Sequence, residues 1–294
     1  MRSLRLQDAA IHVTGFDRPN LRYQSITFRK AKDKQDELVD YLRRRKTGAV
    51  SYTHLDVYKR QVVIHATTAS IEKGESLKDT GRTLQSIVDA IVMRHPSSGA
   101  PVLLSRLIEI PIINAGDGMH AHPSQGLLDA FTILNHKKSL KGLKIVTIGD
   151  IFHSRVARSD AHLFSKLGAR VVFCGPDVLL PNTATELAPG VEIVRDMETA
   201  LKGADVVMML RVQQERLQGM QINVDEYIRR YQLTASRLKL AKKDAIVMHP
   251  GPMIRGMEMT DEVADCKQSV VLEQVLNGVK VRMAILQTIL GGRR

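Results

Sequence analysis

The chain has 294 residues, of which 44% are hydrophobic and 25% charged, a composition typical of a globular protein large enough for two domains. No apolar run reaches the length of a membrane span, and no signal-peptide pattern opens the chain. The two cysteines, Cys174 and Cys266, fit neither a metal-binding spacing nor a disulfide framework. These features predict a reduced, cytoplasmic protein without a membrane segment.

The net charge of +12 would suit a nucleic-acid-binding protein, but it is unevenly distributed. Residues 1–61 carry a net charge of +7, and residues 62–294 carry only +5. The first segment also holds half of the twelve aromatic residues. The composition therefore changes near residue 61, and the basic excess says little about the longer part of the chain.

From residue 62 the chain alternates apolar runs with helical patterns. Strands are predicted over 89–95 and 110–118, and helices over 101–109 and 123–136. Pro123 suits the first position of the last of these helices. The residues predicted to share its apolar face are Leu127, Leu128, Phe131 and Leu134.

The alternation is more regular after residue 140. The predicted strands lie at 144–150, 169–176, 191–196, 204–211 and 245–252, and the helices at 155–167, 197–203 and 224–242. A final helix, 269–290, is too apolar to stand alone and must pack on a domain. Repeated strand–helix alternation predicts an α/β fold of two domains, each with a doubly wound parallel sheet.

Polar residues gather where the predicted strands end, which is where doubly wound sheets bind ligands. These strand ends are 94–96, 114–118, 149–155, 211–213 and 249–252. Each of their residues has an ordinary explanation when taken singly, such as a solvated arginine or a helix cap. Several arginines at one edge nevertheless predict an anionic ligand with carboxylate or phosphate groups, because the guanidinium group binds both in a bidentate manner.

Six motifs resemble the catalytic chain of the aspartate carbamoyltransferase family, in order from about residue 62 to 290. They are SIEKGESLKDT (70–80), VMRHP (92–96), NAGDGMHAHPSQGLLD (114–129), GDIFHSRVARS (149–159), LRVQQER (210–216) and HPGP (249–252). The related ornithine enzymes would carry His-Cys-Leu-Pro in place of the last motif and Ser-Met-Gly in place of Arg211-Val212-Gln213. The resemblance therefore favours aspartate over ornithine as the substrate.

The resemblance implies a carbamoyl-phosphate-binding domain over 62–139, on which residues 267–294 pack back, and a Rossmann-like aspartate-binding domain over 140–266. It also implies a homotrimer with shared active sites that transfers a carbamoyl group from carbamoyl phosphate to L-aspartate. This reaction is an early step of pyrimidine biosynthesis and needs no metal or organic cofactor. No feature of the sequence specifies a regulatory chain or a pathway partner.

The resemblance also implies roles for individual residues. Arg94 would contact the phosphate and the carbonyl oxygen, while His122 and Gln125 would hold the carbamoyl group. His122 stands at a helix start, whose positive end favours a neutral imidazole that can still donate a hydrogen bond. The aspartate carboxylates would be held by Arg155, Arg211 and Gln213, the neighbouring subunit would contribute Ser70 and Lys73, and the carbamoyl pocket would be lined by Gly251 and Pro252.

One element of the family pattern is absent from the sequence. The phosphate-binding loop, Ser-Thr-Arg-Thr, should precede residue 62 and occurs nowhere in the chain. Residues 3–48 resemble instead a fragment of a RecQ-type DNA helicase, and SYTHLDVYKRQ (51–61) resembles neither family. We therefore interpret residues 1–61 as a foreign segment with a chimeric junction, which leaves the first domain incomplete and predicts impaired activity.

Three other classes of function are compared with the sequence. A nicotinamide-dependent dehydrogenase would need a Gly-x-Gly-x-x-Gly turn after 144–150, where the chain has a single glycine, Gly149. A helicase would need a Gly-Lys-Ser/Thr run, which the sequence lacks, so that only salt-sensitive, non-specific DNA binding is left for residues 1–61. The third alternative is a catalytically inactive family member that only forms oligomers.

Overall fold

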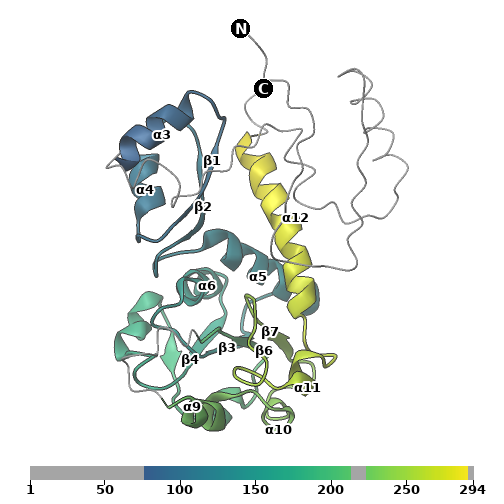
Figure 1. Cartoon of the computed structure of the whole chain (residues 1–294). Coiled ribbons are helices and arrows are strands. Elements are labelled where there is room, and N and C mark those ends of the chain that lie inside the picture. Colours follow the sequence, from purple (N-terminus) through teal and green to yellow (C-terminus); the bar gives the residue numbers. More distant parts are fainter. Residues whose placement is uncertain (1–75, 213–222, 291–294) are drawn as a thin grey trace, which may run out of the picture. The chain divides into compact units, whose positions relative to one another are not determined.

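The computed structural model describes residues 76–212 and 223–290 (Figure 1). The chain divides into two compact units, Met1–His65 and Ala66–Arg294, and all described residues belong to the second. Within these residues no helix is long and apolar enough to cross a membrane. The predicted foreign segment and its junction lie outside the described residues.

The first sheet of the described chain pairs two parallel strands, β1 (Ile91–His95) and β2 (Ile112–Asp117). They are joined through α4 (Ala100–Ser105) and preceded by α3 (Leu77–Gln85), which contacts α4. The register shifts between Met93 and His95, where the strands reach the polar residues at their ends. The strands at 89–95 and 110–118 are thus confirmed, and the helix expected over 101–109 is shorter than predicted.

The second sheet has five parallel strands in the order β5-β4-β3-β6-β7. Its strands are β3 (Lys144–Ile148), β4 (Arg170–Cys174), β5 (Glu192–Ile193), β6 (Val206–Met209) and β7 (Ile246–Met248). In chain order this arrangement is 3-2-1-4-5, so the direction of winding reverses between β3 and β6. The predicted α/β fold with parallel sheets is confirmed, and the reversal marks the edge where such sheets bind ligands.

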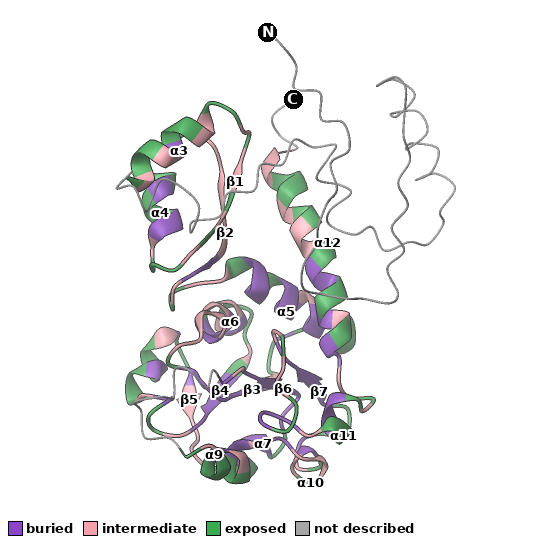
Figure 2. Cartoon of the chain, viewed as in Figure 1, coloured by how far each residue is buried: buried purple, intermediate pink, exposed green. Residues whose placement is uncertain are grey.

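Two hydrophobic clusters cover the two faces of this sheet. Val146, Ile148 and Met209 point into one, and Ile145, Val206 and Met208 point into the other. Because alternate residues of a strand face opposite sides, a strand buried on both faces must be apolar throughout. Figure 2 shows the continuous burial of β3, β4, β6 and β7 that results.

Four of the helices that accompany the second sheet begin at short polar side chains. Ser154, Asp196, Asn223 and Thr234 each accept hydrogen bonds from backbone N–H groups of the first turn that follows. The helices are α6 (Arg155–Lys166), α7 (Met197–Leu201), α9 (Val224–Tyr231), α10 (Ala235–Leu238) and α11 (Asp261–Ala264), with a 3-10 helix, η2, at Asn182–Leu187. The single helix predicted over 224–242 is wrong, because Thr234 begins a new helix after Leu233 bonds to Glu258 and Thr260.

Helix α5 (Pro123–Lys137) packs against α6 and against the last helix, α12 (Val271–Leu290) (Figure 1). The predicted apolar face of α5 is wrong in part, since Leu128 is buried while Leu127 and Leu134 are 43% and 41% exposed. The face that meets α12 is polar instead. It carries Asp129 and Thr132, which accept hydrogen bonds from Gln274 and Asn277 of α12.

Candidate functional site

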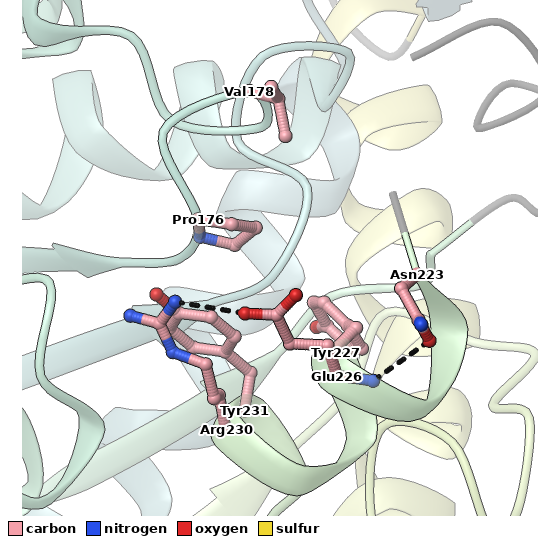
Figure 3. Close-up of a pocket in the computed structure, with 7 residues that line it drawn as sticks. All are labelled: Pro176, Val178, Asn223, Glu226, Tyr227, Arg230 and Tyr231. Carbon is pink, nitrogen blue, oxygen red and sulfur yellow. Dashed lines mark hydrogen bonds and ion pairs between the residues drawn. The ribbon is translucent and has the colours of Figure 1, made fainter. Parts of the chain in front are cut away.

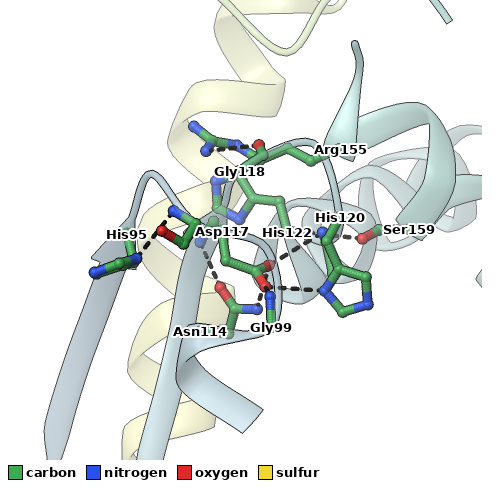
Figure 4. A network of polar contacts seen from close by, with 12 residues as sticks. His95, Gly99, Asn114, Asp117, Gly118, His120, His122, Arg155 and Ser159 are labelled. Carbon is green, nitrogen blue, oxygen red and sulfur yellow. Dashed lines mark hydrogen bonds and ion pairs between the residues drawn. The ribbon is translucent and has the colours of Figure 1, made fainter. Parts of the chain in front are cut away.

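The loop between β2 and α5 is organised by the carboxylate of Asp117, which is fully buried. Its Oδ2 accepts a hydrogen bond from Gly99 N–H at 2.6 Å and lies 2.9 Å from Nδ1 of His120. Its Oδ1 accepts bonds from Asn114 Nδ2 at 2.9 Å and from Ala121 N–H at 3.1 Å (Figure 4). One carboxylate therefore fixes the loop that leads to His122.

The pKa of the Asp117 carboxyl reflects these contacts. Burial alone raises it, but the hydrogen bonds from Asn114, Gly99 and His120 lower it by more, so that the pKa lies below its ordinary value. Asp117 is consequently an ionised, structural carboxylate.

His122 immediately precedes α5 and is held by its backbone. Its N–H donates to Oγ of Ser159 in α6 at 2.8 Å, and its Nδ1 lies 3.4 Å from Oγ of Ser124 (Figure 4). Burial, together with smaller contributions from the charges of Arg155, Arg94 and Arg282, lowers the pKa of His122 to about 4. The imidazole is therefore neutral at pH 7 and can donate a hydrogen bond without carrying charge.

The charges of Arg155 and Arg94 both act on this histidine. Arg155 is the first residue of α6, and its Nη1 donates to the carbonyl of Gly118 at 3.4 Å (Figure 4). A Cβ atom at Gly116 would stand 2.8 Å from Nε of Arg155, so only glycine allows this close approach. Arg94 is exposed on β1. The structure thus brings Arg94, His122 and Arg155 together.

Gln125 lies in the first turn of α5 and is 6% exposed. Its Nε2 donates to Oδ1 of Asp129 at 3.0 Å, and Nε2 of Gln274 donates to the same oxygen. Oε1 of Gln274 in turn accepts from His249 N–H at 3.0 Å. A buried chain of hydrogen bonds therefore joins Gln125 to the segment that follows β7.

Arg211 lies two residues after the end of β6, and its charge acts on His249 and Glu258. The carboxylate of Glu258 is buried and accepts bonds from the N–H groups of Val212 and Ile254. Burial lowers the pKa of His249 to about 4, with a further contribution from Arg211, whereas burial raises the pKa of Glu258. Within the described residues the Nε atom of Arg211 is buried without a hydrogen-bond partner.

Gly251 and Pro252 occupy the loop after β7. Gly251 adopts a φ of +72°, which favours glycine, and its N–H donates to Nδ1 of His249 at 2.9 Å. The peptide bond between Gly251 and Pro252 is cis. The loop is consequently fixed by His249, which is itself held by Gln274.

Ser70, Lys73 and Gln213 lie outside the described residues. Arg282 was not predicted from the sequence, yet its charge acts on His122 from α12. A Cβ at Gly278 would meet its Nη1 at 2.6 Å, so the guanidinium lies against its own helix next to Leu128. The same apolar helix also carries Glu273 and Lys280, so no signal in the sequence singles out Arg282. Asp129, Ser159 and Gln274 gave no signal either, because their partners are far away in the sequence.

A pocket of about 110 Å³ lies elsewhere, between the segment after β4 and helix α9 (Figure 3). Its polar groups are mostly engaged with one another, since Arg230 contacts Glu226 at 3.5 Å and Asn223 caps the helix. It contains none of the predicted site residues. Over residues 76–212 and 223–290, no cluster of three His, Cys, Asp or Glu side chains could hold a metal ion.

Family models match both halves of the chain. The carbamoyl-phosphate-binding domain of aspartate/ornithine carbamoyltransferases matches residues 47–135, and the aspartate/ornithine-binding domain matches residues 141–289. The chain belongs to the aspartate/ornithine carbamoyltransferase family. The aspartate carbamoyltransferase catalytic subunit of Koribacter versatilis is 64% identical over 230 residues, which are 78% of this chain and 76% of that protein. The same subunit of Solibacter usitatus is 55% identical over 231 residues, with the same two coverages.

Solved structures of this carbamoyltransferase family share the fold. Aspartate transcarbamoylase from Trypanosoma cruzi, in complex with N-(phosphonacetyl)-L-aspartic acid, matches with a TM-score of 0.69 and 33% identity over 78% of this chain and 74% of that chain. Ornithine carbamoyltransferase from Pyrococcus furiosus matches with a TM-score of 0.70 and 30% identity over 79% and 76%. The fold is thus common to both enzymes, and the more similar sequences are those named for aspartate.

Proposed function

We propose that this chain transfers the carbamoyl group of carbamoyl phosphate to the α-amine of L-aspartate, giving N-carbamoyl-L-aspartate and phosphate. The observation that carries the proposal is a neutral His122 surrounded by Arg94, Arg155 and Arg282. The substrates bring a phosphate and two carboxylates together, and cations are needed to offset their repulsion. A Trypanosoma cruzi relative has been solved with both carbamoyl phosphate and aspartate bound.

In the proposed reaction the amine attacks the carbonyl carbon, and a tetrahedral oxyanion forms and expels phosphate, which takes up the proton that the amine loses. Arg94 and the neutral imidazole of His122 would donate to the oxyanion, where preorganised donors act most strongly. Gln125, the Gly251 carbonyl and Pro252 would hold the carbamoyl group. Catalysis on this scheme is orientation and electrostatic stabilisation, and it requires no cofactor.

Arg155, Arg211 and Gln213 would bind the aspartate carboxylates. The free Nε donor of Arg211 supports this assignment, because ornithine would present an ammonium group to that cation. The 55–64% identity to chains named for aspartate supports the same choice. We further propose a cytoplasmic homotrimer in which Ser70 and Lys73 of a neighbouring subunit complete each site, with domains divided near residues 61, 139 and 266.

The Arg211→Ala variant tests the substrate assignment in a chain whose residues 1–61 are replaced with a complete family N-terminus. Carbamoyl-aspartate formation is assayed beside the same chain with Arg211 intact. Loss of a charged hydrogen bond should cost about 2–4 kcal/mol, raising the aspartate requirement roughly 30–1000-fold while the requirement for carbamoyl phosphate changes little. Arg229→Ala, which removes an exposed arginine, is the matched control. An unchanged aspartate requirement in the Arg211 variant would refute the assignment.

A second candidate, an inactive family member that only forms oligomers, is favoured by one observation, the missing Ser-Thr-Arg-Thr run. Removing a single preorganised donor typically lowers a rate by ~10²–10³-fold, and here a whole loop is absent. We therefore propose that the chain is impaired. Replacing residues 1–61 with a complete family N-terminus should raise turnover by at least ~10²-fold. Equal turnover with and without the replacement would overturn the proposed impairment.

A further inference from the structure

Two buried carboxyl groups, Asp129 of α5 and Asp160 of α6, face each other where these helices pack. Their residues are 0% and 1% exposed. A Cβ at Gly126 would lie 3.4 Å from Oδ1 of Asp160, and Asp129 follows Gly126 by one helical turn on the same face. Across the described residues, Oδ2 of Asp129 and both carboxyl oxygens of Asp160 have no hydrogen-bond donor.

The charges around the pair do not balance if both groups are ionised. Two charged groups face Asp129: Asp160, which lies on α6, and the cation of Arg282, which lies on α12. The charged group that faces Asp160 is Asp129. Two carboxylates in a dry interior repel each other, and an unpaired buried charge is costly, so one group should hold a proton.

The hydrogen bonds identify the group that stays ionised. Oδ1 of Asp129 accepts bonds from Gln125 and Gln274, whereas the Asp160 oxygens accept none from the described residues. Burial raises the pKa of both carboxyls, and the charge of Asp129 raises that of Asp160 further, whereas the bonds from Gln274 and Gln125 lower that of Asp129. A protonated Asp160 would donate to the Asp129 oxygen that lacks a donor.

We propose that Asp129 and Asp160 share one proton and that this carboxyl pair positions the two parts of the carbamoyl site, Gln125 and the 249–252 loop. Asp129 takes the Nε2 end of Gln125, which leaves Oε1 to accept from the carbamoyl NH2 group. Through Gln274 the same carboxylate holds the N–H group of His249, whose Nδ1 fixes Gly251. The inference rests on the proposed function for the carbamoyl role of Gln125, but the shared proton does not.

Loss of the proton at alkaline pH would leave two facing carboxylates. Their repulsion would strain the packing of α5 on α6 and disturb the hydrogen bond from Gln125. Asp129 and Asp160 are therefore positioning residues, which act on substrate only through Gln125 and the 249–252 loop. The expected signature is a change at Gln125 that follows the titration of the pair.

The experiment uses the full chain without substrate, and infrared spectroscopy at pH 6 and over a series of higher pH values detects the carbonyl stretch of a protonated carboxylic acid. Wild type should show this band, and it should lose intensity in Asp160→Asn, which keeps the shape and supplies an N–H donor to Asp129; buried Glu258, whose pKa is also raised, contributes equally to both proteins. Asp89→Asn, the same change at an exposed position, should keep the band at full intensity. Absence of the band in wild type, or equal band intensity in wild type and Asp160→Asn, would overturn the shared proton.

Unfolding provides a second readout. The native pair holds a proton that the unfolded chain releases near pH 4. Between pH 4 and the native pKa of the pair, wild type therefore loses stability as pH rises. Each pH unit should lower its folding constant by up to about tenfold relative to that of Asp160→Asn. The buried histidines titrate in the same pH range and change the stability in the opposite direction. Their contribution is the same in both proteins, so it cancels in the comparison. Parallel pH profiles in the two proteins would contradict the inference.

Positioning is read from the side-chain amide NMR signal of Gln125, assigned by its loss in Gln125→Met. In wild type it should shift with the same midpoint as the infrared band, and in Asp160→Asn it should not shift. An amide signal that ignores the titration would overturn the positioning role. Because no substrate is present, failure here is distinct from failure of the proposed carbamoyl transfer.

Discussion

The two sheets differ in how completely their strands are buried. In the five-stranded sheet, β6 and β7 are buried along their whole length, and β3 and β4 at all but one residue. In the two-stranded sheet, β1 alternates between partly buried and exposed residues, and Val92 is 61% exposed (Figure 2). The same apolar sequence pattern therefore yields a core only where strands and helices on both sides complete the layers.

The largest expected difference between the sheets is in amide hydrogen exchange. The amides of β3 and β6 should exchange only through global unfolding, which costs about 5–15 kcal/mol in a typical domain. Those of β1 should exchange through local opening, at least ~10²-fold faster. Amide exchange rates measured residue by residue test this prediction, and equal protection of the amides in both sheets would contradict it.

A cavity in the complete sheet should destabilise it strongly. Phe164 of α6 is fully buried against the second sheet, and Phe164→Ala should lower the free energy of unfolding by about 3–5 kcal/mol. Denaturant unfolding measures the effect. A loss below 1 kcal/mol would mean that the core of this sheet is as loosely packed as the exposed face of β1.

The free energy of unfolding at acid pH should also depend on His249, which follows β7 of the five-stranded sheet. The lowered pKa of His249 means that, as pH falls from 6.5 towards 4, the unfolded chain binds a proton that the native chain does not, so stability falls. This histidine should contribute at most about 3 kcal/mol over that range. His249→Asn retains an acceptor for Gly251 N–H and should flatten the slope measured by unfolding at several pH values. An unchanged slope would exclude His249 as its source.

The smallest expected effect is that of Val92→Ala. Its side chain is mostly exposed on β1, so the free energy of unfolding should change by no more than about 0.5 kcal/mol. This variant is the counterpart of Phe164→Ala and is measured in the same way. A loss of 2 kcal/mol or more would show that β1 is buried in solution, for example in an assembly.

The strands of both sheets were predictable because each is an apolar run of suitable length between polar turns. The buried face of α5 was not, because the pattern of Leu127 and Leu134 outweighed Asp129, whose partner Gln274 lies in another helix. The break at Leu233 was likewise hidden, since it depends on Glu258 and Thr260. Arg94, His122 and Arg155 could be grouped from motif resemblance, but Arg282 and Asp160 depend on packing that a single sequence does not reveal.

The hydrogen bond between Gln274 and Asp129 can form only late in the synthesis of the chain. Its partners are 145 residues apart, as are Asn277 and Thr132 beside them. At about 5–20 residues per second, the ribosome needs roughly 7–30 s to add the second partner after the first. During that interval α5 has emerged with Asp129 and Thr132 lacking their partners on α12. The polar face of α5 must remain hydrated until α12 leaves the exit tunnel, so assembly of the site has to wait for the synthesis of α12.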